Sequence, residues 1–201
     1  QVNTHAIGDN ANKAVLDNYE QLIAETSSRG LRHRVEHAQI LRYEDIFRFA
    51  ELGVIPSMQA THATSDKNMA IDRIGEVRIQ GAYAWRKLID AGALIANGSD
   101  FPVESPNPFF GLHAAITRQD KNNQPPGGWC PEEKMTAIEA FASFTIDAAY
   151  SGHQENLLGT LEPGKKADFI ILDRDIFAID DSQIWQIEVE QTWVNGQRVS
   201  N

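Results

Sequence analysis

Three strand-like runs in this 201-residue chain carry side chains that can bind a metal ion. The first run carries His5, the second carries His37, and the third ends in Asp100. Two histidines and a carboxylate form a ligand set of catalytic divalent cations. The C-terminal ends of parallel barrel strands meet at one rim, which is where an α/β barrel keeps its chemistry. We therefore expect His5, His37 and Asp100 to converge as metal ligands.

The chemistry of such a site is hydrolytic. A zinc-like ion lowers the pKa of its water to roughly 7, and a carboxylate can take the proton and return it to a leaving nitrogen. A single histidine at a strand end is more often a satisfied polar residue, but three candidates in consecutive units favour a site. His62 is a weaker candidate for substrate contact, with Asp66 nearby, and a solvent-facing loop histidine explains it equally well.

The elements that position these residues alternate between strand-like and helix-like stretches over the first hundred residues. This alternation predicts parallel βα units, and four of them make half of an eight-stranded barrel. The expected strands are residues 1–9, 31–36, 54–59 and 93–100; the expected helices are 9–30, 44–53 and 83–92; a long loop is expected over 60–75.

The pattern changes after residue 100. Prolines mark a loop, a helix is expected over 110–118, and a polar surface loop over 119–130. The sequence Thr136-Ala137-Ile138-Glu139 is a capping box that opens a helix to about Ser151. A strand is expected over 167–173, and Asn195-Gly196 between β-forming runs predicts a hairpin. We divide the chain into a barrel segment, residues 1–155, and a small β element, residues 156–201.

Composition excludes several classes of partner. The formal charge is −10, from 18 basic and 28 acidic residues, which argues against nucleic acid and anionic membranes. No run approaches the roughly 20 apolar residues of a membrane span. The single cysteine, Cys130, precludes an internal disulfide and fits a reducing, cytoplasmic compartment. The chain opens at Gln1 rather than methionine, which leaves room for a leader or a whole upstream segment before it.

Three motifs also carry a family resemblance. His5-Ala6-Ile7-Gly8-Asp9, Glu36-His37-Ala38-Gln39 and Gly98-Ser99-Asp100-Phe101-Pro102 resemble the fifth-, sixth- and eighth-strand motifs of the amidohydrolase superfamily. They are most similar to the branch that contains N-substituted formamide deformylase. Residues 159–173 resemble the segment in which that family returns from its barrel to a small β-sandwich. The resemblance implies the C-terminal half of a TIM barrel followed by a β-sandwich segment.

The resemblance also implies roles for individual residues. His5 resembles a ligand of the active-site metal. His37 resembles a histidine that binds a second metal, or contacts substrate or hydroxide in members with one metal. Asp100 resembles the aspartate that serves as ligand and general base. The His-x-His pair of the family's first strand does not occur in this sequence, nor does a fourth-strand lysine or glutamate that could bridge two metals.

The expected function is metal-dependent hydrolysis of a carbon–nitrogen bond in a small non-peptide amide, formamide or cyclic amide. The expected cofactor is one or two divalent ions, zinc first, with iron or manganese as alternatives. Two other functions remain open: a deaminase of the same architecture, and a catalytically incomplete fragment without the N-terminal ligands. Open barrel edges predict a homo-oligomer or association with the N-terminal half.

Overall fold

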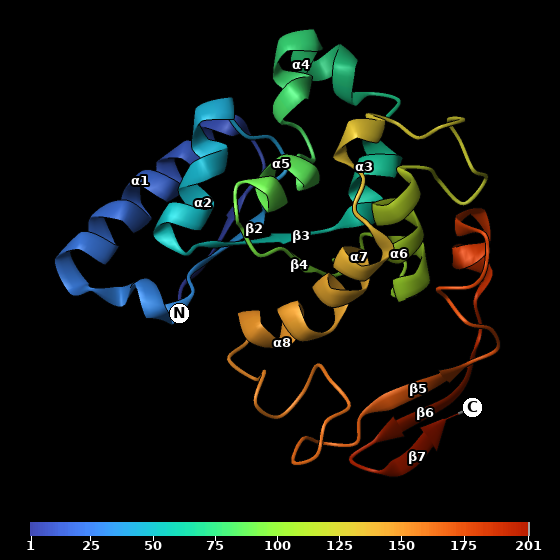
Figure 1. Ribbon diagram of the computed structural model, residues 1–201. Coiled ribbons are helices and arrows are strands. Elements are labelled where there is room, and N and C mark those ends of the chain that lie inside the picture. Colours follow the sequence, from blue (N-terminus) through green and yellow to red (C-terminus); the bar gives the residue numbers. More distant parts are fainter. Residues whose placement is uncertain (201) are drawn as a thin grey trace.

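The parallel sheet positions the candidate ligands. The structure, a computed structural model, describes residues 1–200. Its first sheet has four strands in the order β1-β2-β3-β4, each parallel to its neighbour (Figure 1). The strands are β1 (Asn3–Ala6), β2 (Arg34–His37), β3 (Ile55–Met58) and β4 (Ala96–Asn97). The four expected parallel strands are thus confirmed, although β4 is only two residues long.

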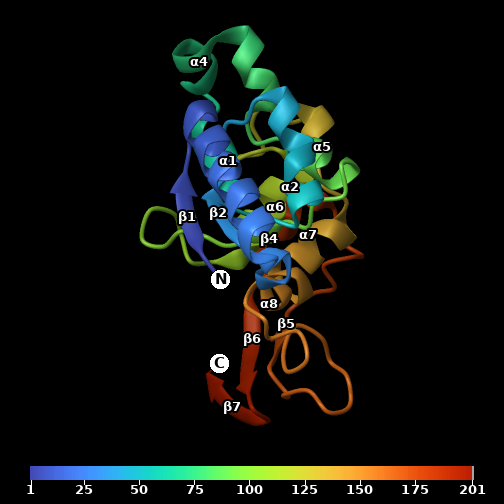
Figure 2. The ribbon, with the colours of Figure 1, turned by 90° about the vertical axis from the view of Figure 1, so that its left-hand side faces the viewer.

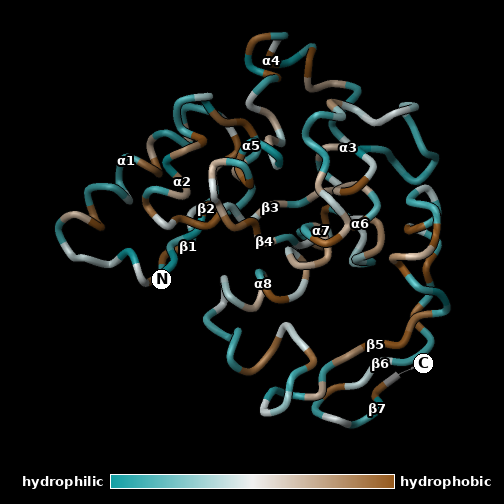
Figure 3. The backbone as a smooth tube through the Cα atoms, viewed as in Figure 1, coloured by the Kyte–Doolittle hydropathy of each residue, from teal (hydrophilic) through white to brown (hydrophobic). Residues whose placement is uncertain are grey.

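Helices follow the strands and cover the sheet. After β1 comes α1 (Asp9–Thr26), after β2 comes α2 (Ile46–Leu52), and before β4 comes α5 (Trp85–Asp90). Hydrophobic residues recur between hydrophilic ones along α1 (Figure 3), and the buried face of this helix carries Leu16 and Tyr19. This periodicity is typical of a helix packed on one side. Figure 2 shows α1 and α2 side by side in front of the sheet.

The core forms where these helices meet the strands. Leu16, Val35, Phe49, Trp85 and Leu88 have no solvent-exposed surface. Burial of such side chains contributes roughly 1.5–3 kcal/mol each. The remaining α-helices are α3 (Ala60–Asp66), α4 (Ala70–Arg78), α6 (Pro108–Thr117), α7 (Ala137–Phe144) and α8 (Ile146–Ser151). Short 3-10 helices are η1 (Ser28–Leu31), η2 (Tyr43–Asp45), η3 (Ile79–Gly81), η4 (Pro131–Glu133) and η5 (Asp181–Gln186).

The C-terminal part forms a separate antiparallel sheet below the parallel one (Figure 1). Its strands are β5 (Phe169–Leu172), β6 (Val189–Val194) and β7 (Gln197–Ser200). Asn195 and Gly196 both have positive φ, at 51° and 74°, as the predicted two-residue hairpin requires. The hairpin is confirmed. The described C-terminal strands β5, β6 and β7 make a single sheet, so the β-sandwich and the boundary at residue 155 stay predictions.

Three local predictions are wrong. The expected loop over 60–75 contains α3 and the start of α4, because tertiary packing of Ala60 and Ala63 overrides the weak helix propensity of neighbouring threonines. The expected helix over 9–30 ends at Thr26, because Ser27 adopts a left-handed conformation with φ of 55°, and η1 follows it. The helix that begins after Thr136 has the predicted capping box but breaks at Thr145, where ψ is −94°. Within the described residues, no helix is long and apolar enough to cross a bilayer.

We predict that Gly81→Ala destabilises the fold by about 1–3 kcal/mol or more. A Cβ at Gly81 would lie 1.9 Å from the carbonyl oxygen of Leu41, whose N–H donates to the Gly81 carbonyl at 2.8 Å. Urea denaturation should show the loss. Gly30→Ala is the matched control, because a Cβ at Gly30 meets no atom within 4 Å. Equal midpoints for the two variants would contradict the predicted clash.

We also predict an acid-labile contribution from Glu139. The Arg86 guanidinium, aided by the backbone N–H of Thr136, lowers the pKa of Glu139 from 4.5 to about 2. Because the folded state favours the carboxylate, this contribution is fully present above pH 4.5 and is lost as the pH falls toward 2. Glu139→Gln should lower stability at pH 7 and flatten its pH dependence in that window. Glu132→Gln, at an exposed position, should not.

Candidate metal centre

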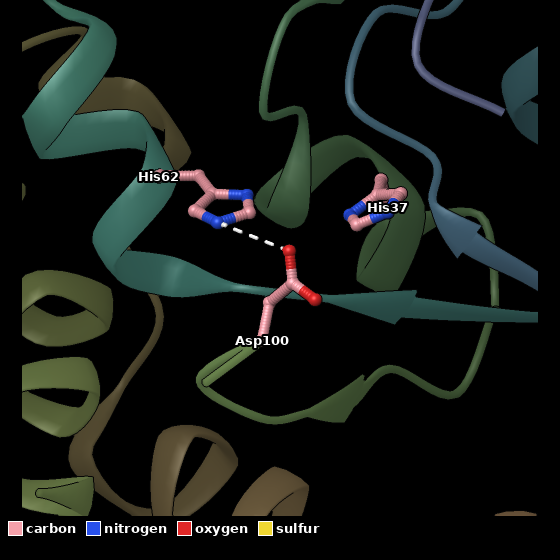
Figure 4. A group of neighbouring side chains, drawn as sticks. All are labelled: His37, His62 and Asp100. Carbon is pink, nitrogen blue, oxygen red and sulfur yellow. Dashed lines mark ion pairs between the residues drawn. The ribbon is translucent and has the colours of Figure 1, made fainter. Parts of the chain in front are cut away.

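Three side chains from three elements meet at the C-terminal ends of the parallel strands. His37 is the last residue of β2, His62 lies in the first turn of α3, and Asp100 follows β4. Each offers one donor atom, and the three donor atoms lie within 4.8 Å of one another. Figure 4 shows the three side chains turned toward a common space. The structure therefore brings together His37 and Asp100 as expected and adds His62.

His5 lies beside this group but outside it. Its ring packs edge-on against His37, with ring centroids 4.5 Å apart and planes at 76°. The parallel register explains the proximity, because Ala6, the residue after His5, pairs with His37. His5 is thus next to the expected partner, and its role as a ligand stays a prediction. The sequence predicts at most a substrate contact for His62, because it predicts a loop over 60–75.

The remaining histidines are not part of the centre. His33 and His113 are buried and hydrogen-bonded, His33 to the N–H of Val2 and His113 to Asn123. His153 lies near the carbonyl of Leu31, at 3.1 Å. His33 and His113 are therefore packing residues, and His153 is a surface residue.

The backbone at the centre is conformationally unusual. φ is 77° at His37, 45° at Ala38 and 55° at Asp100. Non-glycine residues rarely adopt this left-handed region, which costs of order 1–3 kcal/mol at each position and is concentrated at functional sites. Aspartate tolerates it better than most residues. The surrounding structure must therefore hold the turn after β2 and the segment after β4 in place.

A partly buried hydrogen-bond network holds the turn after β2 against α3. The Tyr83 hydroxyl donates to Asp66 at the end of α3, and Gln39 donates to both Asp66, at 2.9 Å, and the Tyr83 oxygen, at 2.6 Å. The backbone N–H of Tyr83 also donates to the Gln39 carbonyl at 2.7 Å. Burial raises the pKa of Tyr83, so the phenol stays a donor. The network links the segment after His37 to the helix that carries His62.

His62 is electrostatically suited to bind a cation. Burial lowers the pKa of His62, and the carboxylates of Glu104 and Asp100 oppose this shift without reversing it. The imidazole is therefore neutral near pH 7 and keeps a lone pair. Its Nε2 atom is buried without a hydrogen-bond partner and lies 3.8 Å from an Asp100 oxygen. An unpartnered buried polar atom costs about 1–3 kcal/mol, which a bound ion would offset.

The donor set fits a divalent metal. Imidazole and carboxylate ligands suit zinc, iron and manganese. Ligand atoms at about 2.1 Å from a tetrahedral ion are about 3.4 Å apart, so the three donor atoms, which lie within 4.8 Å of one another, would move closer together to bind one ion. Asp100 has 38% of its side chain exposed, whereas His62 has 12% exposed. The carboxylate is therefore the donor that an incoming molecule can reach.

Comparison with known proteins identifies the family. The sequence profile described as the amidohydrolase family matches residues 1–200. The chain therefore belongs to the amidohydrolase family, a family of hydrolases. The family resemblance inferred from its motifs is confirmed. The putative amidohydrolase YtcJ of Bacillus subtilis is 35% identical over 199 residues, which are 99% of this chain and 37% of that protein.

Three further proteins are similar to this chain. Protein LONG AFTER FAR-RED 3 of Arabidopsis thaliana is 36% identical, covering 99% of this chain and 34% of its own length. N-substituted formamide deformylase of Arthrobacter pascens is 28% identical, covering 96% and 35%. The structure of an uncharacterized metal-dependent hydrolase from Pyrococcus horikoshii is 30% identical with a TM-score of 0.77, covering 90% and 35%. The chain spans about a third of the length of these relatives.

We predict that zinc binding depends on the three clustered donors. His62→Ala and Asp100→Asn should each weaken zinc binding by more than about tenfold in calorimetric titration of the metal-free chain. His153→Ala is the control, because His153 is exposed and lies outside the group. Affinity unchanged in His62→Ala but lost in His5→Ala would show that the ion uses His5 in place of His62.

Proposed function

We propose that this chain carries part of the active site of a metal-dependent hydrolase that cleaves carbon–nitrogen bonds in small non-peptide amides, formamides or cyclic amides. The observation that carries the proposal is the group of His37, His62 and Asp100 at the C-terminal ends of three parallel units. Similarity to N-substituted formamide deformylase, 28% identical, supports the bond type. We propose zinc as the ion, with iron or manganese as alternatives.

Each residue of the candidate centre has a separate proposed role. When bound, a divalent ion polarises a carbonyl and lowers the pKa of a coordinated water to about 7. His37 and His62 would hold the ion through ring nitrogens. Asp100, the exposed member, takes a proton from the attacking water and delivers it to the leaving nitrogen. His5, whose ring packs on His37, is a further candidate ligand.

The proposed architecture extends beyond the described sheet. We propose that β1–β4 form the C-terminal half of a TIM barrel and that residues 156–201 belong to a β-sandwich. Among the described residues, β1 pairs only with β2 and β4 only with β3, so both outer edges lack a partner strand. Unpaired edges favour association with other strands. We propose that a polypeptide supplying the N-terminal half, or a second copy of the chain, covers them in the cytoplasm.

We predict that Asp100→Asn lowers turnover of an N-substituted formamide by about 10²–10⁴-fold, because the amide cannot accept the proton and also binds the ion more weakly. The assay measures formate and amine release by the zinc-loaded chain, alone and with any co-purifying partner polypeptide. Asp72→Asn, at an exposed position of α4, is the control and should keep the wild-type rate.

Three outcomes would change the proposal. A wild-type rate in Asp100→Asn would rule out the proton-transfer role. Ammonia release from a nucleobase-like ring, with no formamide cleavage, would favour a deaminase. Stoichiometric zinc with no turnover of any amide would favour a catalytically incomplete fragment.

A further inference from the structure

Gln59 contacts both candidate histidine ligands. Its side-chain Oε1 atom lies 2.8 Å from Nδ1 of His37. Its backbone carbonyl accepts a hydrogen bond from the N–H of His62 at 3.2 Å. Gln59 occupies the N-cap position of α3, in extended conformation, and only 9% of it is exposed. One buried residue therefore joins the end of β2 to the first turn of the helix that carries His62.

The orientation of the Gln59 amide determines which ring nitrogen of His37 carries the proton. The amide nitrogen Nε2 lies 3.4 Å from the carbonyl oxygen of Ser57. A carbonyl oxygen accepts hydrogen bonds only, so Nε2 belongs on that side and Oε1 faces His37. Because Oε1 is also only an acceptor, Nδ1 of His37 must be the donor. A neutral His37 then keeps its lone pair on Nε2.

We infer that Gln59 is a positioning residue that holds His37 in the Nδ1–H tautomer and so presents Nε2 to the metal. The inference rests on the proposed metal site for its functional meaning. Imidazole in water favours the opposite, Nε2–H form, which has no lone pair on Nε2. Gln59 therefore fixes the imidazole proton of His37 on Nδ1 in the metal-free chain. In Figure 4 a ring nitrogen of His37 faces the space between His62 and Asp100.

A neutral amide is a distinctive choice for this role. Metal-binding histidines commonly donate their second N–H to a carboxylate, a backbone carbonyl or water. A carboxylate would make the imidazole more basic and add a negative charge beside the ion. Gln59 fixes the tautomer without adding charge, which leaves the bound ion a stronger Lewis acid. Glutamate at this position keeps the acceptor and therefore keeps the tautomer, whereas leucine removes it.

The test is the protonation pattern of His37 in the metal-free chain at pH 8, measured from long-range ¹H–¹⁵N correlations of the imidazole. The wild-type chain should show the Nδ1–H form, Gln59→Glu should keep it, and Gln59→Leu should shift it to the Nε2–H form. Titration with zinc alone should show about 10–100-fold weaker binding for Gln59→Leu. Gln59→Glu should bind zinc at least as tightly as wild type.

The outcomes separate this inference from the proposed function. An Nε2–H tautomer in the wild-type chain, or an Nδ1–H tautomer that persists in Gln59→Leu, would overturn it. If Gln59→Leu does not fold, the wild-type and Gln59→Glu spectra still decide the tautomer. If the wild-type chain shows the Nδ1–H form but binds no zinc, the positioning role stands and the proposed metal site fails.

Discussion

Parallel strand pairing is the constraint on which the candidate centre depends. A one-residue register shift in a strand would turn its side chains to the opposite face. The observed register pairs Ala6 with His37 and brings the imidazole of His5 against that of His37. Continuing the same sheet, β3 and β4 direct the chain toward His62 and Asp100. The strand register therefore determines how close the candidate ligands lie to one another at the C-terminal ends of the strands.

The backbone of the candidate centre is strained, so contacts in the rest of the fold must supply the free energy that keeps it in place. His37, Ala38 and Asp100 all adopt left-handed backbone conformations, which cost free energy for residues with a Cβ. The Gln39–Asp66–Tyr83 network offsets part of this cost directly beside the strained turn. Tyr83 itself has a positive φ of 51°, so it is held by its contacts and not by local preference. A strained turn retained by several hydrogen bonds is typical of a preorganised site.

Sequence reasoning located the parts of the centre that follow strand ends. His37 and Asp100 could be found because an apolar run leads into each, and the topology of βα units then predicts where they meet. His62 could not be assigned to the centre, because α3 is short and rich in alanine and threonine and forms through packing against α6. Gln59 carried no signal at all. Its importance lies in a contact across 22 residues with His37, and no local pattern encodes that contact.

His37 lies between the other residues of the candidate centre and has contacts with His5, His62 and Gln59. Its ring contacts His5 edge-on at 4.5 Å and stacks near His62 at 5.9 Å, while its Nδ1 atom contacts Gln59. A centre built on His5 and one built on His62 would therefore both need the same His37 lone pair. The two arrangements differ in burial, because His5 is exposed on β1 whereas His62 is held in a helix with a buried, unpartnered Nε2. Desolvation strengthens the attraction between a lone pair and a cation, so we expect His37 and His62 to bind a cation more tightly than His37 and His5.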